Sequence, residues 1–388
     1  MHRRARWMLP EGVDELLPPE AAQAEALRRR LLDLYWAWGY ELIMPPAIEY
    51  LESLLTGTGR DMDVQTLKVT DQASGRTLGL RPDITPQAAR IDAHQLRREG
   101  VSRLCYIGGT LRAQPEGPAG SRDALQLGAE LYGHAGVASD LEVISLMLAS
   151  LRCAGLDDLH LDIGHVGISH ALTSELGLSA VEEAALFDAL QRKAGDEIAA
   201  VLDEAGVEQA QAERLSALAE LHGGAEALER ADQVLGWAGP AVAGVLEQLR
   251  AVVESLQARE PGLSLHLDLG ELRGYRYHTG LVFAAYTPGY GRELARGGRY
   301  DGIGQAFGRQ RPATGYSAEL KALLSLGDGP EAPSGGVLAP WGEDPALLQR
   351  VAELRAAGER VVWQLPGDTD HHGCDRRLVA YNGTWELE

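Results

Sequence analysis

Two arginines and two hydrogen-bonding residues lie close together around a Gly/Pro-rich segment. Arg112 and Arg122 flank the stretch AQPEGPAGS, and Gln126 and Glu130 follow it. A guanidinium is the preferred bidentate partner of a phosphate or carboxylate, whereas an amide and a carboxylate suit the amino group of a small molecule. These residues therefore predict a pocket for a ligand that carries both charges; the alternative is a solvated hairpin loop.

The stretch LRPDIT places Asp83 and Thr85 two residues apart. In an extended segment both side chains would point to the same side. There Asp83 could accept hydrogen bonds from an ammonium group, and Thr85 could add a hydroxyl contact. The alternative is an ordinary Pro-Asp turn.

Two glycine-bounded segments near position 300 carry most of the polar aromatic residues. GELRGYRYHTG, residues 270–280, holds two arginines, two tyrosines and a histidine, and ARGGRYDG, residues 295–302, holds paired glycines. Tyrosine and histidine can border an aromatic ligand while offering a hydrogen bond, and glycines allow a close backbone approach. The alternative is an internally satisfied buried network. The spacing lacks the G-x-G-x-x-G pattern, so we expect no dinucleotide-binding fold.

The stretch DTDHHGCD, residues 368–375, combines histidines, a cysteine and carboxylates. Its spacing matches no standard zinc pattern and its polar groups lie in one short segment, so we expect no metal site. The sequence also contains no recognisable catalytic triad and no P-loop.

Composition limits the class of protein. The chain has 388 residues and a formal net charge of −20, and long-range repulsion makes such a chain a poor general binder of polyanions. Its three widely spaced cysteines fit a reduced cytoplasm. Because the apolar runs are too short to cross a bilayer, we expect no membrane-spanning segment.

The elements that must position these residues follow from hydrophobic periodicity. An apolar stripe predicts a helix from Glu20 to Gly39, and a second helix is expected over 140–151, capped by Ser139 or Asp140. Period-two alternation predicts strands over four ranges, namely 125–132, 158–164, 265–270 and 281–286. No regular crossover helices separate these strands, so we expect an α+β fold with an antiparallel sheet. Its polar face would be either the floor of a pocket or a solvated surface.

Composition also divides the chain into parts. Residues 1–169 and 259–326 form the expected core, and the Ala/Leu/Glu-rich stretch 170–258 reads as an insertion of four or five helices. We expect this insertion to have a structural or partner-binding role. A linker precedes a small α/β unit within residues 327–388. In this unit Asp344-Pro345 is expected to cap a helix that runs to Ala357, and the unit closes with a hairpin at Asn382-Gly383.

In this order, the segments resemble the catalytic core of histidyl-tRNA synthetase, a class II synthetase fold, over roughly residues 8–326. LRPDIT looks like the motif for the substrate amino group, and the stretch from Leu111 to Glu130 looks like the second class II motif. LRGYRYHTG and RGGRYDG look like the two histidine-pocket motifs, and the stretch from Gly315 occupies the place of the third class II motif.

The departures from the family lie in its ATP-binding half. Gln114 replaces the glutamate that reads adenine, Ala124 replaces the aromatic that stacks on adenine, and Ala322 replaces the arginine that holds the ATP tail, with Lys321 beside it. Arg273 persists in the histidine motif, and Tyr277-His278 replaces a tyrosine pair. Losing a stacking partner forfeits about 1–3 kcal/mol per base, so the resemblance implies a decayed ATP site beside a retained histidine site.

This profile is similar to one branch of the family, the regulatory subunits of ATP phosphoribosyltransferase. The resemblance implies a cytoplasmic, non-catalytic subunit in histidine biosynthesis that needs no cofactor. It would assemble, as a homodimer within a hetero-octamer, with the short-form catalytic subunit and confer feedback inhibition by histidine. Neither tRNA nor a membrane would be a partner.

The resemblance also assigns roles to the candidate residues. Asp83, Thr85, Gln126 and Glu130 would hold the α-amino end of histidine. Arg112 and Arg273 would face its carboxylate or an anion of the partner complex, and Tyr277, His278 and Tyr300 would border the imidazole. Histidine binding at the interface with the partner stays open. Two other functions also stay open: an active histidyl-tRNA synthetase, and an amino-acid sensor of another pathway.

Overall fold

A computed structural model describes residues 7–115, 120–174, 176–236, 238–271, 277–330 and 334–388. The chain forms two compact units. One comprises residues 1–16 and 27–329, and the other comprises residues 17–26 and 330–388. All the candidate site residues lie in the first unit.

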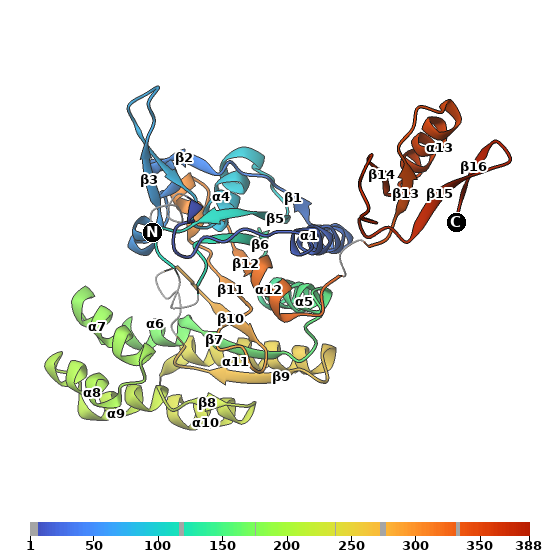
Figure 1. Cartoon of the computed structure of the whole chain (residues 1–388). Coiled ribbons are helices and arrows are strands. Elements are labelled where there is room, and N and C mark those ends of the chain that lie inside the picture. Colours follow the sequence, from blue (N-terminus) through green and yellow to red (C-terminus); the bar gives the residue numbers. More distant parts are fainter. Residues whose placement is uncertain (1–6, 116–119, 175, 237, 272–276, 331–333) are drawn as a thin grey trace, which may run out of the picture. The chain divides into compact units, whose positions relative to one another are not determined.

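The first unit is built on a sheet whose nine described strands follow the order β1-β5-β6-β12-β11-β10-β7-β9-β8 (Figure 1). In that order the strands are Glu41–Leu42, Ser102–Leu111, Asp123–Tyr132, Ala313–Glu319, Ala295–Arg299, Leu281–Tyr286, His160–His165, Ser264–Asp268 and His222–Gly223. The central pairs, from β5 to β7, are antiparallel, as predicted. Two pairs nearer the edges, β1 with β5 and β7 with β9, are parallel, so the sheet is mixed.

The alternation in β6 determines which face is buried by helices. Leu127, Ala129 and Leu131 are at most 1 % exposed. Helix α5 (Val137–Cys153) packs against β6, β12, β11 and β10 and contributes a largely apolar surface. The other face of β6 carries Gln126 and Glu130, as the period of two predicts.

The start of α5 differs from the prediction. Its N-cap is Gly136, and neither Ser139 nor Asp140 caps it. The Ser139 hydroxyl instead shares its one proton between the carbonyl oxygens of Gly136, at 2.8 Å, and His134, at 3.1 Å. Asp140 forms an ion pair with Arg299, so tertiary contacts occupy both expected capping side chains.

A smaller three-stranded sheet leads into the site. It contains β2 (Ile48–Tyr50), β3 (Leu67–Thr70) and β4 (Thr77–Leu80), in the order β2-β4-β3. The short helices α2 (Leu51–Leu54) and α3 (Arg60–Gln65) lie between β2 and β3 in the chain. The helix α4 (Thr85–Arg90) and the π-helix η2 (Ile91–Leu96) follow β4.

Helices make up nearly all of the insertion. In Figure 1, α7 to α10 gather near the β8 end of the main sheet. The helices are α6 (Val166–Ser174), α7 (Ala180–Gln191), α8 (Gly195–Glu204), α9 (Gln209–Leu218), α10 (Glu226–Leu235) and α11 (Gly239–Arg259). The stretch predicted as an insertion of four or five helices also contains the short strand β8, which extends the main sheet by pairing with β9.

Further helices belong wholly or partly to the first unit. Helix α1 (Glu20–Ala37) buries Leu27, Leu31 and Tyr35 of its predicted stripe, although Trp38 lies beyond its end and is exposed. The 3₁₀ helix η3 (Ile303–Phe307) follows β11, and α12 (Leu320–Leu326) follows β12.

The C-terminal residues form the predicted α/β unit. Its sheet, in the order β14-β13-β15-β16, contains Val361–Gln364, Val337–Pro340, Arg376–Tyr381 and Thr384–Leu387. Helix α13 (Pro345–Ala356) begins after the predicted cap, Asp344, whose side chain accepts the Ala346 N–H at 3.0 Å. The turn between β15 and β16 has positive φ at Asn382 and Gly383, as a two-residue hairpin requires.

Candidate ligand-binding site

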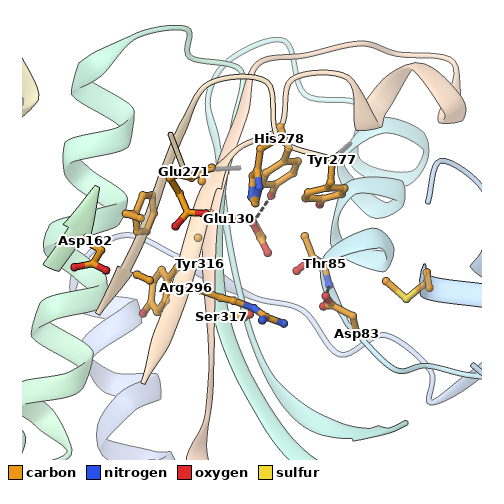
Figure 2. A pocket seen from close by; sticks show the side chains of 18 of the residues that line it. Asp83, Thr85, Glu130, Asp162, Glu271, Tyr277, His278, Arg296, Tyr316 and Ser317 are labelled. Atoms are coloured by element: carbon orange, nitrogen blue, oxygen red, sulfur yellow. Dashed lines mark hydrogen bonds between the residues drawn. The ribbon is translucent and has the colours of Figure 1, made fainter. Parts of the chain in front are cut away.

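A cavity of about 450 Å³ lies on the polar face of the main sheet. In Figure 2, Asp83 and Thr85 lie on one side of the cavity and Asp162 on the opposite side, with Glu130 drawn between them. We call the part around Asp83, Thr85, Glu130 and Tyr300 the amino-acid end. The part around Arg112, Arg296 and Ser317, together with Glu319 beside it, is the arginine end. The polar face of the strands is thus the wall of a pocket.

Asp83 and Gln126 form a preorganised pair at the amino-acid end. The Gln126 amide nitrogen donates to Asp83 Oδ1 at 2.8 Å, and its oxygen accepts the Ile84 N–H at 2.9 Å. Gln126 is therefore held from both ends of its amide and positions Asp83. The expectation that Asp83 and Thr85 share one face of an extended segment is wrong, because Thr85 begins α4 and its N–H donates to Asp83 Oδ1 at 2.9 Å.

Glu130 lies at the centre of a buried chain of hydroxyl groups. The Tyr106 hydroxyl donates to Glu130 Oε1 at 2.9 Å, and the Tyr300 hydroxyl donates to Oε2. The Thr85 hydroxyl extends this chain and lies 3.0 Å from the Tyr106 hydroxyl. Burial raises the pKa of the Glu130 carboxyl to about 8, although these hydrogen bonds oppose the rise.

Glycines provide the space that these side chains occupy. A β-carbon at Gly315 would lie 1.6 Å from Glu130 Oε2, and one at Gly128 would lie 2.4 Å from the Tyr106 hydroxyl. Both glycines lie on strands that pair across the site, Gly315 opposite Glu130 and Gly128 opposite Tyr106. Any side chain at either position would displace the hydrogen-bonded chain.

Three aromatic rings border the amino-acid end. Tyr277 stacks on Tyr300 with ring centroids 5.1 Å apart, and His278 meets Tyr277 edge-on at 5.3 Å. All three line the cavity. The Tyr277 hydroxyl is buried without a hydrogen-bond partner among the described residues.

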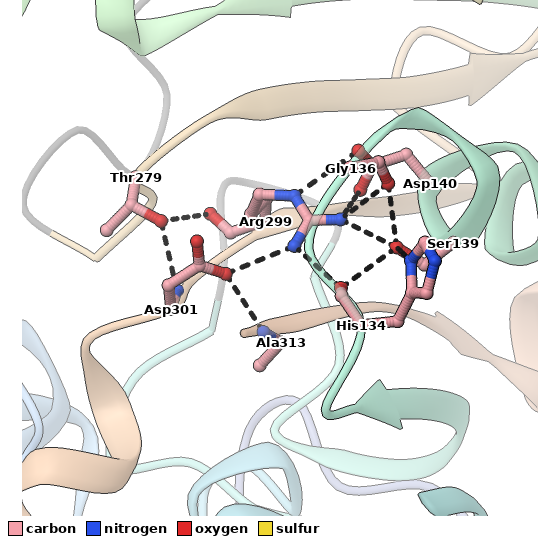
Figure 3. Close-up of polar contacts among 8 residues, drawn as sticks. All are labelled: His134, Gly136, Ser139, Asp140, Thr279, Arg299, Asp301 and Ala313. Atoms are coloured by element: carbon pink, nitrogen blue, oxygen red, sulfur yellow. Dashed lines mark hydrogen bonds and ion pairs between the residues drawn. The ribbon is translucent and has the colours of Figure 1, made fainter. Parts of the chain in front are cut away.

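Arg299 connects this aromatic wall to the start of α5 (Figure 3). Its guanidinium contacts Asp140 at 2.9 Å and Asp301 at 3.2 Å and donates to the Ser139 hydroxyl at 2.8 Å. Arg299 and Asp140 are only 8 % and 5 % exposed. Burial raises the pKa of Asp140 although Arg299 opposes the rise.

The same network holds the chain on both sides of Tyr300. The Asp301 carboxylate accepts the Ala313 N–H at 2.9 Å, and the Asp301 N–H donates to the Thr279 hydroxyl at 2.9 Å. The Thr279 N–H donates to the Arg299 carbonyl at 2.7 Å. Arg299 is therefore a positioning residue for Tyr300 and for the segment that carries Tyr277 and His278.

At the arginine end, Arg112 pairs with Glu319 at 2.8 Å. Arg122 is not among the residues that line the cavity. Its Nε instead donates to the Arg112 carbonyl at 3.0 Å. The predicted loop between the two arginines lies partly outside the described residues, at 116–119. Lys321 of α12 contacts the Asp123 carboxylate at 3.2 Å, and Ala322 lines a hollow of about 40 Å³ beside Arg112.

Comparison with known proteins decides the family. The family model for histidyl-tRNA synthetase matches residues 12–323, and the model for the ATP phosphoribosyltransferase subunit HisZ C-terminal domain matches residues 334–388. A protein of Alkalilimnicola ehrlichii named ATP phosphoribosyltransferase regulatory subunit is 59 % identical over 97 % of this chain and 96 % of its own length. The chain belongs to the family of ATP phosphoribosyltransferase regulatory subunits.

Two further relatives agree with this assignment. A regulatory subunit of the same name from Thioalkalivibrio sulfidiphilus is 55 % identical over 96 % of both chains. A solved structure from Bacillus halodurans, described as an ATP phosphoribosyltransferase regulatory subunit/histidyl-tRNA synthetase, is 30 % identical with a TM-score of 0.80 and covers 94 % of each chain. The predicted class II synthetase-like fold and the predicted regulatory-subunit family are confirmed.

The structure gathers most of the predicted residues of this family member around one cavity. Seven of them line it, namely Asp83, Thr85, Arg112, Glu130, Tyr277, His278 and Tyr300. Gln126 lies behind Asp83 and lines the smaller hollow. Arg273 lies outside the described residues.

Sequence reasoning missed Tyr106 and Glu319. Tyr106 lies in β5, and Gly128, its partner across the sheet, could have indicated a large side chain opposite. Nothing in the local pattern around Glu319 predicts its contact with Arg112, because the two residues are far apart in the sequence. Asp162 and Asp268 also line the cavity. The sequence predicted the strands that carry them and the polar faces of those strands, but it did not identify these two residues as part of the site.

The histidine-rich segment of the C-terminal unit has local partners. His372 Nε2 lies 2.5 Å from Asp368 Oδ2, and Arg360 contacts Cys374 Sγ at 3.4 Å. In the part of the chain that the structure describes, no three His, Cys, Asp or Glu side chains are grouped as a metal site requires. None of the described helices is both long and apolar enough to span a membrane.

Proposed function

We propose that the chain assembles with a short-form ATP phosphoribosyltransferase catalytic subunit in the cytoplasm and makes its activity sensitive to histidine. The identity of 59 % to a protein named as the regulatory subunit, over nearly the whole of both chains, carries the proposal. The catalytic partner would condense ATP with phosphoribosyl pyrophosphate, the first step of histidine biosynthesis. This chain would supply no catalytic group.

Histidine is the effector that best suits the amino-acid end. Asp83 would accept hydrogen bonds from its α-ammonium group, with Gln126 fixing the carboxylate and Thr85 adjoining it. Tyr277, His278 and Tyr300 would border the imidazole. The cavity, about 450 Å³, falls within the roughly 300–1,000 Å³ typical of small-molecule pockets.

Glu130 would supply the counter-charge for a cationic group of the ligand. Its carboxyl is 1 % exposed and hydrogen-bonded by two neutral hydroxyls. A ligand cation beside it would favour the ionised form. Histidine should therefore displace a proton from Glu130 on binding near neutral pH.

The ligand carboxylate would face Arg112 and Arg273. Arg112 lines the cavity and contacts Glu319, so a ligand carboxylate would have to share that guanidinium.

Feedback requires that histidine favour one state of the assembly over another. We propose a homodimer of this chain within a hetero-octamer, and no binding of tRNA or a metal. The core of residues 1–169 and 259–326 would carry the site. The insertion, 170–258, would have a structural or partner-binding role, alongside the separate C-terminal unit, 327–388.

The decisive experiment mixes the pure chain with a short-form catalytic subunit and measures turnover with and without histidine. The proposal expects turnover to depend on this chain and to fall when histidine is added. Turnover that is unchanged when this chain is added, or unchanged when histidine is added, would contradict the proposal.

An active histidyl-tRNA synthetase is the second candidate function, favoured by the family model that matches residues 12–323. The absence of an arginine at Ala322 and the engagement of Arg112 by Glu319 argue against it. Histidine-dependent exchange between ATP and pyrophosphate distinguishes the two. Robust exchange by the pure chain would establish the synthetase.

A further inference from the structure

The arginine end contains an ion pair that joins two strands across a third. Arg112 directly follows β5, Glu319 ends β12, and β6 lies between these strands. Their side chains meet at 2.8 Å and are only 11 % and 18 % exposed. Water screens the attraction between these two charges less than it screens a surface ion pair.

The strand register explains how the two side chains reach each other. Glu319 pairs with Gln126, and Thr110 pairs with Ala124. Cross-strand partners share a face, so Glu319, Gln126, Ala124 and Thr110 all point to the cavity side, as does Arg112, two residues after Thr110. Ala124 carries only a methyl group, which leaves room above β6 for the ion pair.

Other cations near this end also have carboxylate partners within the chain. Lys321 contacts Asp123 at 3.2 Å, and Arg296 contacts Glu293 at 3.0 Å. One side chain of each of these pairs is at least 40 % exposed, so water screens them more than the Arg112–Glu319 pair. Of the carboxylates in these three pairs, Glu319 is thus the one whose charge water screens least.

From this geometry we propose that Glu319 is a built-in counter-ion that makes the cavity reject phosphate-bearing ligands. A phosphate could reach Arg112 only by sharing or displacing Glu319, which would then remain beside it as a like charge. Repulsion of this kind is an established source of specificity. A ligand with a single carboxylate meets less repulsion, so the pair selects a small zwitterion over a nucleotide.

The inference builds on the proposed function, since it explains why the proposed amino-acid pocket refuses ATP. Its test uses pyrophosphate and ATP as probes and needs neither histidine nor the catalytic partner. Histidine titrated into the same preparations reports the proposed function separately. Failure of one proposal is therefore distinguishable from failure of the other.

The test compares the full-length chain with Glu319→Gln by isothermal titration calorimetry. We expect no saturable pyrophosphate or ATP binding to the wild-type chain at millimolar concentration. In Glu319→Gln we expect saturable binding, with an affinity at least about tenfold above the limit set by the wild-type titration, because the Glu319 charge no longer competes for Arg112. Glu41→Gln, which removes a carboxylate from the exposed pair with Arg98 and lies outside the residues that line the cavity, is the matched control and should leave phosphate binding unchanged.

Two further variants establish the cause. Adding Arg112→Met to Glu319→Gln should abolish the gained binding. Glu319→Ser, which also removes the charge but can still hydrogen-bond, replaces Glu319→Gln if thermal unfolding shows that the latter does not fold. The proposal is overturned if the wild-type chain binds these probes as well as the variants do. It is also overturned if neither neutral variant gains binding, if the control gains as much, or if the gain survives Arg112→Met.

Discussion

At the amino-acid end of the cavity, Glu130 accepts hydrogen bonds from two neutral tyrosine hydroxyls, whereas at the arginine end Arg112 faces the carboxylate of Glu319. Both ends lie along strand β6, but the charged group at one end has neutral partners and the charged group at the other has an oppositely charged partner. A buried carboxyl among neutral groups gains from a ligand cation. A cation that already has an internal anion gains less from a second one.

Under the proposed function, this difference would let a synthetase-like fold keep an amino-acid pocket without binding a nucleotide. The absence of an arginine at Ala322 and the carboxylate beside Arg112 would each weaken binding of ATP. Neither change touches Asp83, Thr85 or Glu130. The residues of one end can therefore be substituted without changing those of the other, although strand β6 joins the two ends.

The largest expected effect comes from breaking the support behind the amino-acid end. Arg299→Met should destabilise the fold by about 3–5 kcal/mol, because it leaves the Asp140 carboxyl buried without its cationic partner. Urea unfolding measures this change. Arg296→Met, on the same strand but in a half-exposed ion pair, should cost less than about 1 kcal/mol. Equal losses in the two variants would show that the buried Arg299–Asp140 pair stabilises the fold no more than the half-exposed pair does.

The second prediction concerns the pH dependence of stability. A carboxyl whose pKa is raised in the folded state stabilises the fold below its ordinary pKa of 4.5, and this contribution is lost as pH rises through about 8. Each pH unit in this window removes at most about 1.4 kcal/mol. Glu130→Gln should therefore flatten the fall in unfolding free energy between pH 5 and 8. The prediction fails if urea titrations of the ligand-free proteins give parallel pH profiles.

The third prediction tests the amino-acid end with histidine itself. Loss of a hydrogen bond to a charged group costs about 1.5–3 kcal/mol, so Glu130→Gln should weaken histidine binding about 10- to 150-fold. Calorimetry measures the affinity. Glu41→Gln removes an exposed carboxylate that pairs with Arg98 and serves as the control. Unchanged affinity in Glu130→Gln would place the histidine site elsewhere, for example at the interface with the partner.

The smallest expected effect is at Tyr277. Its hydroxyl has no partner among the described residues, so Tyr277→Phe should leave the stability of the ligand-free protein within about 0.5 kcal/mol of wild type. If the hydroxyl binds the imidazole, affinity for histidine should fall about fivefold, as expected for a neutral hydrogen bond. A large loss of stability with unchanged affinity would show that the hydroxyl has a structural role instead.

Local patterns in the sequence accounted for the elements that carry the site. Alternation in β6 placed Gln126 and Glu130 on one face of the strand and Leu127 and Leu131 on the other, because successive side chains of a strand point to opposite faces. The Asn382-Gly383 turn and the Asp344 cap were equally readable, since each depends on backbone geometry within a few residues. The order of the motifs along the chain was enough to indicate the family.

Contacts between distant residues required the tertiary structure. Ser139 and Asp140 have the chemistry of helix caps, yet Arg299 draws Asp140 into an ion pair and Gly136 takes the capping position. Asp83 and Thr85 looked like neighbours on a strand, but the start of α4 turns the chain between them. In both cases partners far along the chain, or the start of a helix, prevailed over local propensity.

The sequence alone thus determined which residue types are available and which face of each strand they occupy, because these follow from periods of two and 3.6 residues. Only the tertiary structure decided which charges meet. Arg112 and Glu319 lie more than 200 positions apart, and strand order, which no local period encodes, brings them together across β6.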